Sequence, residues 1–164
     1  DGSTQFTIPT QIGQELQWSD VDQDYLLYQD VVGEEKDFAL NTYLFNLETR
    51  QSTNLSEETG LDLTQARWVT GEFALYLSGR EVDDEPGSRI FHYDLVTGTL
   101  TEIREYQSSL PRYLTVSPDG SSMVYEQYGI FDRDEFSGVW RLDRDSTSLR
   151  LTDLGRNPLW LVWD

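Results

Sequence analysis

The sequence predicts an all-β fold built from repeated four-stranded antiparallel units, and three observations support this prediction. Aromatic side chains make up 13% of the 164 residues, a proportion that favours strands. Apolar residues fall in short alternating runs separated by turn residues, and no segment keeps a helical period. The same order of runs also recurs about every 48 residues. About three complete repeats are therefore expected.

The first repeat is expected to cover residues 14–58. Its four strands are predicted at 15–20, 25–28, 42–47 and 52–56. The second and third repeats, at 62–106 and 110–154, carry the same features in the same order. Their strands are predicted at 66–70, 73–76, 90–95 and 100–103, and at 114–117, 123–125, 139–143 and 149–152.

Aromatic landmarks set the register between the repeats. In both the second and the third strand, these landmarks are spaced 48 and 49 residues apart; they are Tyr28, Tyr76 and Tyr125, and Tyr43, Phe91 and Trp140. Four short strands in a repeat of roughly 45 residues are typical of a β-propeller blade. The fold class predicted from the sequence is thus a set of β-propeller blades.

Two segments resemble a known repeat family. The hairpin at 114–125, with its Ser-Pro-Asp-Gly turn, and the strand and turn at 91–98 resemble the WD40-like repeat of TolB-type propellers. The first repeat departs from that pattern at 19–24, and Arg50 stands where the turn glycine would be. The resemblance implies a propeller of six to eight blades. It also implies functions ranging from periplasmic or secreted scaffolds to peptidase regulatory domains and polysaccharide lyases.

The two ends of the chain are expected to be single strands of adjacent, incomplete blades. Residues 3–9 resemble a fourth strand, and residues 158–164 resemble a first strand. An open arc of three blades would leave strand edges unpaired. The favoured interpretation is a piece of a longer propeller, and the alternative is a homodimer that completes one ring.

Composition excludes several classes of partner and of chemistry. The 12 Lys and Arg residues face 30 Asp and Glu residues, and the net charge of -18 disfavours binding to nucleic acid or to anionic lipid. No apolar stretch is long enough for membrane insertion. The sequence has no cysteine, which excludes disulfides and thiolate metal sites.

Acidic residues gather in the three segments that join the second and third strands. These segments are expected to emerge on one face of the propeller and to bind a protein partner, in particular a basic one. The candidate partner-binding residues are Glu34, Glu35, Asp37, Asp83, Asp84, Glu85, Asp132, Asp134 and Glu135. The simpler alternative is three solvated loops of an acidic protein.

No catalytic residue, cofactor or metal site is predicted. His92 is the single histidine, and the Gly-x-Ser-x-Gly motif of serine hydrolases does not occur. The carboxylates at 20–24 alternate as in a calcium loop but lack its glycine and distal glutamate, so a plain turn is preferred and calcium is the alternative. Trp18, Trp68 and Trp163 recur at the first strand, where packing between blades is preferred to a sugar-stacking role.

The sequence therefore predicts a non-catalytic interaction or scaffold propeller, in an extracytoplasmic location. One alternative is a regulatory propeller segment of a serine peptidase or a carbohydrate-active propeller enzyme. Another is a purely structural spacer without a ligand.

Overall fold

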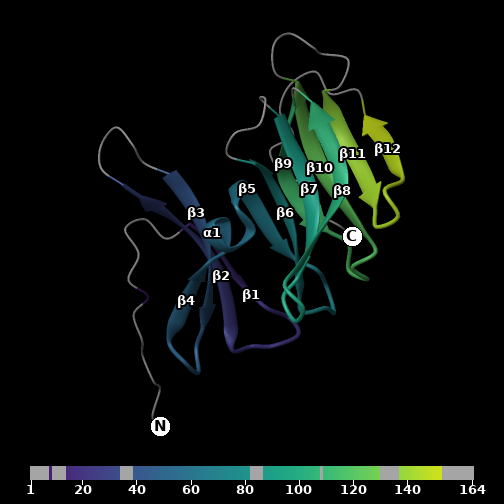
Figure 1. Cartoon of the computed structure of the whole chain (residues 1–164). Helices are drawn as coiled ribbons and strands as arrows, with labels where there is room; N and C mark the ends of the chain where they lie inside the picture. Colours follow the sequence, from purple (N-terminus) through teal and green to yellow (C-terminus); the bar gives the residue numbers. More distant parts are fainter. Residues whose placement is uncertain are drawn as a thin grey trace.

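The computed structural model describes residue 8 and residues 14–33, 39–81, 87–107, 109–129 and 137–152. Their strands form three separate four-stranded sheets, each antiparallel with its strands in chain order (Figure 1). The predicted all-β, blade-like architecture is confirmed. Of the two predicted end strands, only residue 8 is described, so the pairing of 3–9 and 158–164 remains a prediction.

The first sheet is followed by a short helix that the sequence analysis did not predict. The strands are β1 (Gln14–Trp18), β2 (Tyr25–Val32), β3 (Ala39–Asn46) and β4 (Gln51–Asn54), and the helix α1 spans Leu55–Thr59. The Asn54 side chain accepts hydrogen bonds from the first helical N–H groups, and Gly60 ends the helix in the left-handed conformation. One turn is too short to show a period, so only these two caps could have signalled it.

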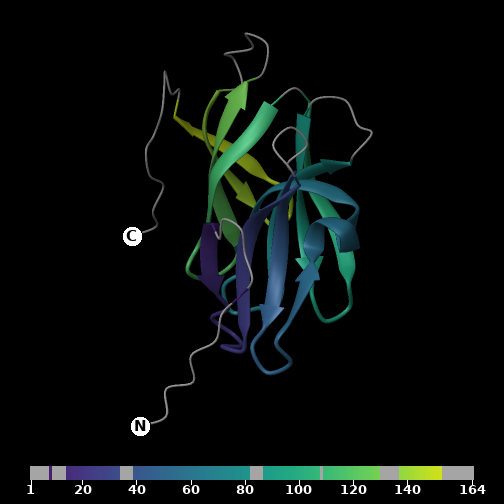
Figure 2. The same ribbon diagram turned by 90° about the vertical axis from the view of Figure 1, so that its left-hand side faces the viewer.

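The second and third sheets repeat the plan of the first. The second contains β5 (Leu61–Trp68), β6 (Ala74–Glu81), β7 (Gly87–Asp94) and β8 (Thr99–Gln107), and the third contains β9 (Ser109–Val116), β10 (Ser122–Gly129), β11 (Gly138–Asp143) and β12 (Ser148–Thr152). Seen from the side, the sheets stand next to one another with their faces in contact (Figure 2). No helix of the described residues is long and apolar enough to span a membrane.

Strand pairing corrects one of the two landmarks used to align the repeats. Tyr28 pairs with Tyr43 and Tyr125 pairs with Trp140, but the partner of Phe91 is Leu77. The third-strand landmarks therefore correspond, whereas the structural equivalent of Tyr28 and Tyr125 is Leu77. Tyr76 points to the other face of its sheet, because successive strand residues alternate between faces.

The cause of this shift is the length of the first hairpin turn. Trp18 pairs with Leu26, across seven intervening residues, whereas Trp68 pairs with Leu75 across six. The third sheet matches the second, since six residues also separate Val116 from its partner Met123. The extra residue of the first turn moves every later residue of β2 by one place relative to β6.

The core lies between the sheets. Leu27 and Leu44 of the first sheet pack against Leu75 and Phe91 of the second. On the opposite face of the second sheet, Tyr76 joins a buried cluster whose members from the third sheet are Leu114, Met123, Tyr125 and Leu142. Each sheet thus depends on its neighbour to bury one face, as expected for stacked blades.

The Ser-Pro-Asp-Gly turn of the third sheet packs tightly against the second. Gly120 has a positive φ of 71°, and a Cβ atom there would lie 2.5 Å from the backbone oxygen of Thr70. The Thr70 hydroxyl donates to the backbone oxygen of Ser117, at 3.0 Å. Within the turn, the Asp119 carboxylate accepts hydrogen bonds from the Ser117 hydroxyl and from the hydroxyl and N–H of Ser121, and these bonds lower the pKa of Asp119 to about 2. Glycine is therefore required here by both conformation and space.

Replacing Gly120 with Ala should destabilise the protein by about 2 to 4 kcal/mol, from left-handed strain together with overpacking. The matched control is Gly98→Ala, where φ is also positive, at 66°, but no heavy atom lies within 4 Å of the added Cβ. This control should cost about 1 kcal/mol. Urea unfolding of both variants measures the difference, and equal costs would contradict the tight packing of the turn.

Candidate functional site

A groove of about 380 Å³ crosses the ends of the three first strands. Its lining comes from β1, β5 and β9 and the turns after β1 and β5; the residues are Gln17, Trp18, Asp20, Arg67, Trp68, Thr70, Thr115 and Val116. Because β5 contacts β9 across the gap between two sheets, the first strands lie where neighbouring blades meet. In a propeller this is the side that faces the central axis.

One hydrogen bond along the groove recurs at both interfaces between blades. The Gln17 side-chain amide donates to the backbone oxygen of Ala66, at 3.1 Å, and joins β1 to β5. The Arg67 Nε donates to the backbone oxygen of Leu114, at 2.9 Å, and joins β5 to β9. Gln17 and Arg67 occupy equivalent positions, each directly before the tryptophan that ends the strand pairing. A side-chain donor at this position therefore ties each first strand to the next.

Other polar groups of the groove are also engaged between blades. The Arg67 Nη1 atom donates to Glu15 at 2.6 Å and to the backbone oxygen of Ala66 at 2.8 Å. The Asp20 carboxylate accepts a hydrogen bond from the N–H of Gly71, at 3.1 Å. These groups therefore take part in the contact between blades.

Two tryptophans at equivalent positions have different surroundings. Trp68 is 8% exposed, and its indole N–H donates to the backbone oxygen of Gln17 on the preceding blade, at 3.2 Å. Trp18 is 57% exposed. The predicted packing of these residues between blades is therefore seen at Trp68, while Trp18 presents its ring at one side of the groove. Trp163 lies outside the described residues.

Trp68→Ala should therefore lower the free energy of unfolding by about 3 to 5 kcal/mol, because it removes a large buried ring and a hydrogen bond between blades. Trp18→Ala should cost about 1 kcal/mol or less, as for an exposed side chain. Denaturant unfolding followed by circular dichroism measures both, and a loss of similar size at the two positions would contradict the difference in burial.

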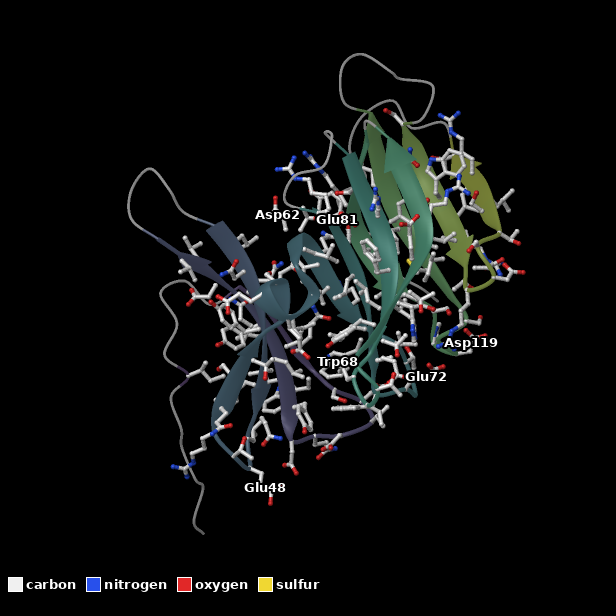
Figure 3. The ribbon with its side chains drawn as sticks, in the orientation of Figure 1. Glu48, Asp62, Trp68, Glu72, Glu81 and Asp119 are labelled. Carbon is white, nitrogen blue, oxygen red and sulfur yellow. The ribbon has the colours of Figure 1, made fainter. Side chains whose placement is uncertain are left out.

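All nine candidate partner-binding residues, from Glu34 to Glu135, lie outside the described residues. The strand ends that flank these segments are described. The end of each second strand pairs with the start of the third strand of the same sheet, as Val32 pairs with Ala39 and Gln127 with Gly138. These strand ends lie on one side of the three sheets (Figure 1). Asp62 and Glu81 mark that side, and Trp68, Glu72 and Asp119 mark the opposite one (Figure 3).

The alternating carboxylates after β1 act as turn residues. The side chain of Asp22 accepts the N–H of Asp24 at 3.0 Å, and the hydroxyl of Ser19 accepts the N–H of Asp22 at 3.0 Å. This is the hydrogen-bonding of a plain turn, as the sequence predicted. Among the residues that the structure describes, no group of three or more His, Asp and Glu side chains could hold a metal ion.

His92 lies on β7 beside charged groups and away from the groove. Its Nε2 atom is 2.9 Å from Arg144 and 3.7 Å from a Glu72 oxygen. Burial first, and the Arg144 charge second, lower the pKa of His92 from its ordinary value.

Comparison with known proteins identifies the architecture. No protein-family profile matches the sequence, and no curated protein matches it. Among solved structures, TolB from Acinetobacter baumannii superposes with a TM-score of 0.61 at 20% identity, over 84% of this chain. An oligogalacturonate lyase in complex with manganese superposes with a TM-score of 0.65 at 16% identity, over 94% of this chain.

Both of these proteins contain β-propellers, so the predicted TolB-like propeller fold is confirmed. The chain spans 31% of the length of TolB and 39% of that of the lyase. At these identities the similarity concerns the fold, and it does not transfer an activity.

Proposed function

We propose that the chain is a non-catalytic interaction segment of a β-propeller and that its acidic segments bind a basic protein partner. One observation carries the proposal: the strand ends that flank the segments 34–37, 83–85 and 132–135 all lie on the same side of the three sheets. Because all three segments connect a second to a third strand, we expect their charges to lie at one end of the blades.

The charge of these segments favours a cationic surface as the partner. Together they contain nine carboxylates and two basic residues, Lys36 and Arg133, within a chain of net charge -18. A concentration of one sign of charge steers an oppositely charged protein and increases its association rate. Nucleic acid and anionic membranes would be repelled by the same field.

The groove supports a scaffold rather than a catalyst. Gln17, Arg67 and Asp20 engage atoms of the neighbouring blade, and these bonds hold the sheets together. The similarity to TolB fits the role of a scaffold propeller, and on this basis we place the protein outside the cytoplasm. That location is part of the proposal.

Binding of a decalysine peptide tests the proposed face. The triple variant Asp83→Asn, Asp84→Asn, Glu85→Gln should bind the peptide several-fold more weakly than the unmodified protein, because it removes three charges from the face. For the unmodified protein, raising the salt from about 50 to about 300 mM should weaken binding at least tenfold, since the Debye length shortens. Isothermal titration calorimetry measures both effects.

The matched control removes the same number of charges elsewhere. Asp22→Asn, Asp24→Asn and Glu48→Gln together lower the negative charge equally, and the amide introduced in place of Asp22 would keep the side-chain oxygen that the turn uses. This control should bind the peptide nearly as well as the unmodified protein. Equal weakening by the two triple variants would show that only net charge matters and would contradict a dedicated face.

A carbohydrate-active propeller is the second candidate. The observation that favours it is the superposition of 94% of this chain on the oligogalacturonate lyase. A regulatory propeller of a serine peptidase is also an enzyme-associated alternative. A peptidase domain encoded in the same gene would identify it.

Incubation with oligogalacturonate and manganese separates the first proposal from this second candidate. We expect no shortening of the oligosaccharide, because the described residues include no metal-ligand cluster and the single histidine is engaged by Arg144. Chromatography of the products provides the measurement. Turnover that depends on manganese would overturn the non-catalytic assignment.

A further inference from the structure

Three charged or titratable side chains meet where the third blade contacts the second. Glu72 lies in the turn between β5 and β6, His92 lies on β7, and Arg144 lies in the turn between β11 and β12. The Arg144 guanidinium donates two hydrogen bonds to the Glu72 carboxylate, each at 2.5 Å. Its Nη2 atom also lies 2.9 Å from the Nε2 atom of His92. A turn of one blade is thus anchored to two elements of its neighbour.

His92 is enclosed by this contact. Its side chain is 17% exposed, and its ring stands edge-on to the ring of Tyr76, with centroids 5.7 Å apart. The Tyr76 hydroxyl in turn donates to the backbone oxygen of Gly120 in the third blade, at 3.2 Å. The imidazole therefore sits within the packing of blade two against blade three and not on an open surface.

The protonation state of His92 follows from its partner. A guanidinium group has only donors, so the hydrogen bond with Arg144 requires Nε2 to be an acceptor and the ring to be neutral, with its proton on Nδ1. A proton on Nε2 would remove this acceptor and place a second cation against Arg144. The charged and titratable groups around the ring are Arg144, Glu72, Asp94 and Tyr76.

We propose that Glu72, His92 and Arg144 form a pH-sensitive latch that holds the β11–β12 turn of the third blade on the second blade and loosens when His92 is protonated. The latch is separate from the acidic segments, because Glu72 lies on the opposite side of the sheets from the strand ends that flank those segments, and Arg144 and His92 both lie next to Glu72 (Figure 3).

The direction of the pH effect follows from linkage. Burial and Arg144 outweigh the opposing effects of Glu72 and Asp94, so the pKa of His92 in the folded protein lies below the ordinary value of 6.5. On acidification the unfolded chain binds the proton first, and the contribution of the latch declines as the pH falls from 6.5 through the folded-state pKa. Above pH 6.5 the contribution is fully present.

The single histidine makes a direct measurement simple, since one imidazole signal in the NMR spectrum belongs to His92. In the unmodified protein this signal should titrate below pH 6.5. In Arg144→Gln the midpoint should move upward, because a neighbouring cation is removed. Arg144 has a side-chain exposure of 43%, so this substitution leaves no buried cavity. A midpoint at or above 6.5 in the unmodified protein, or no upward shift in the variant, would overturn the proposal.

Hydrogen exchange tests whether protonation loosens the turn. His92→Gln keeps a side-chain acceptor for Arg144 but does not titrate. At each pH, the exchange rate of amides 144–147 in the unmodified protein is divided by the rate in this variant, which cancels the intrinsic pH dependence of exchange. The ratio should rise at least threefold between pH 7.5 and pH 5.5. A constant ratio would contradict the latch.

A control variant isolates the position of the latch. Arg80→Gln removes the ion pair between Arg80 and Asp62, whose side chains are 41% and 49% exposed, respectively. Asp62 lies on the opposite side of the sheets from Glu72 (Figure 3). In this variant the ratio should rise with acidification as it does in the unmodified protein. Loss of the pH response in Arg80→Gln would show a general charge effect and would also overturn the proposal.

Discussion

The arrangement of the three sheets depends on hydrogen bonds that connect the first strands of neighbouring blades. Gln17 and Arg67 occupy the same position and each donates to a backbone oxygen of the next first strand, at Ala66 and Leu114. The described strands of each sheet pair only with strands of the same sheet, so the separation and angle between sheets depend on contacts other than strand pairing. The buried clusters on either side of the second sheet supply the apolar area, and the directional bonds determine how the sheets are placed.

This constraint also bears on the proposed interaction role. Polar groups of the groove are bonded to neighbouring blades, as Asp20 is to Gly71. The segments between the second and third strands lie outside the described residues, and connections of this kind generally tolerate changes of sequence. The concentration of acidic residues in these segments is therefore compatible with the structural demands on the rest of each blade.

Most of the fold could be predicted from the sequence, because few known architectures have a repeat of about 48 residues with four alternating apolar runs. It did not reveal α1, since one helical turn has no measurable period. It also did not reveal the recurring donor at Gln17 and Arg67, because the two residue types differ and the bond spans two blades. The cluster of Glu72, His92 and Arg144 was hidden for the same reason, as its members are separated by up to 72 residues.

The additional residue in the first hairpin turn gives two similar tyrosines different roles. Tyr28 shares a hydrogen bond with Ser52 of its own sheet, at 3.0 Å, whereas Tyr76 donates to Gly120 of the following blade. The blade with the longer turn thus has a phenol that bonds within its own sheet, whereas the blade with the shorter turn has a phenol that connects two sheets. Repeats of this kind can diverge through the length of a turn as well as through the identity of a side chain.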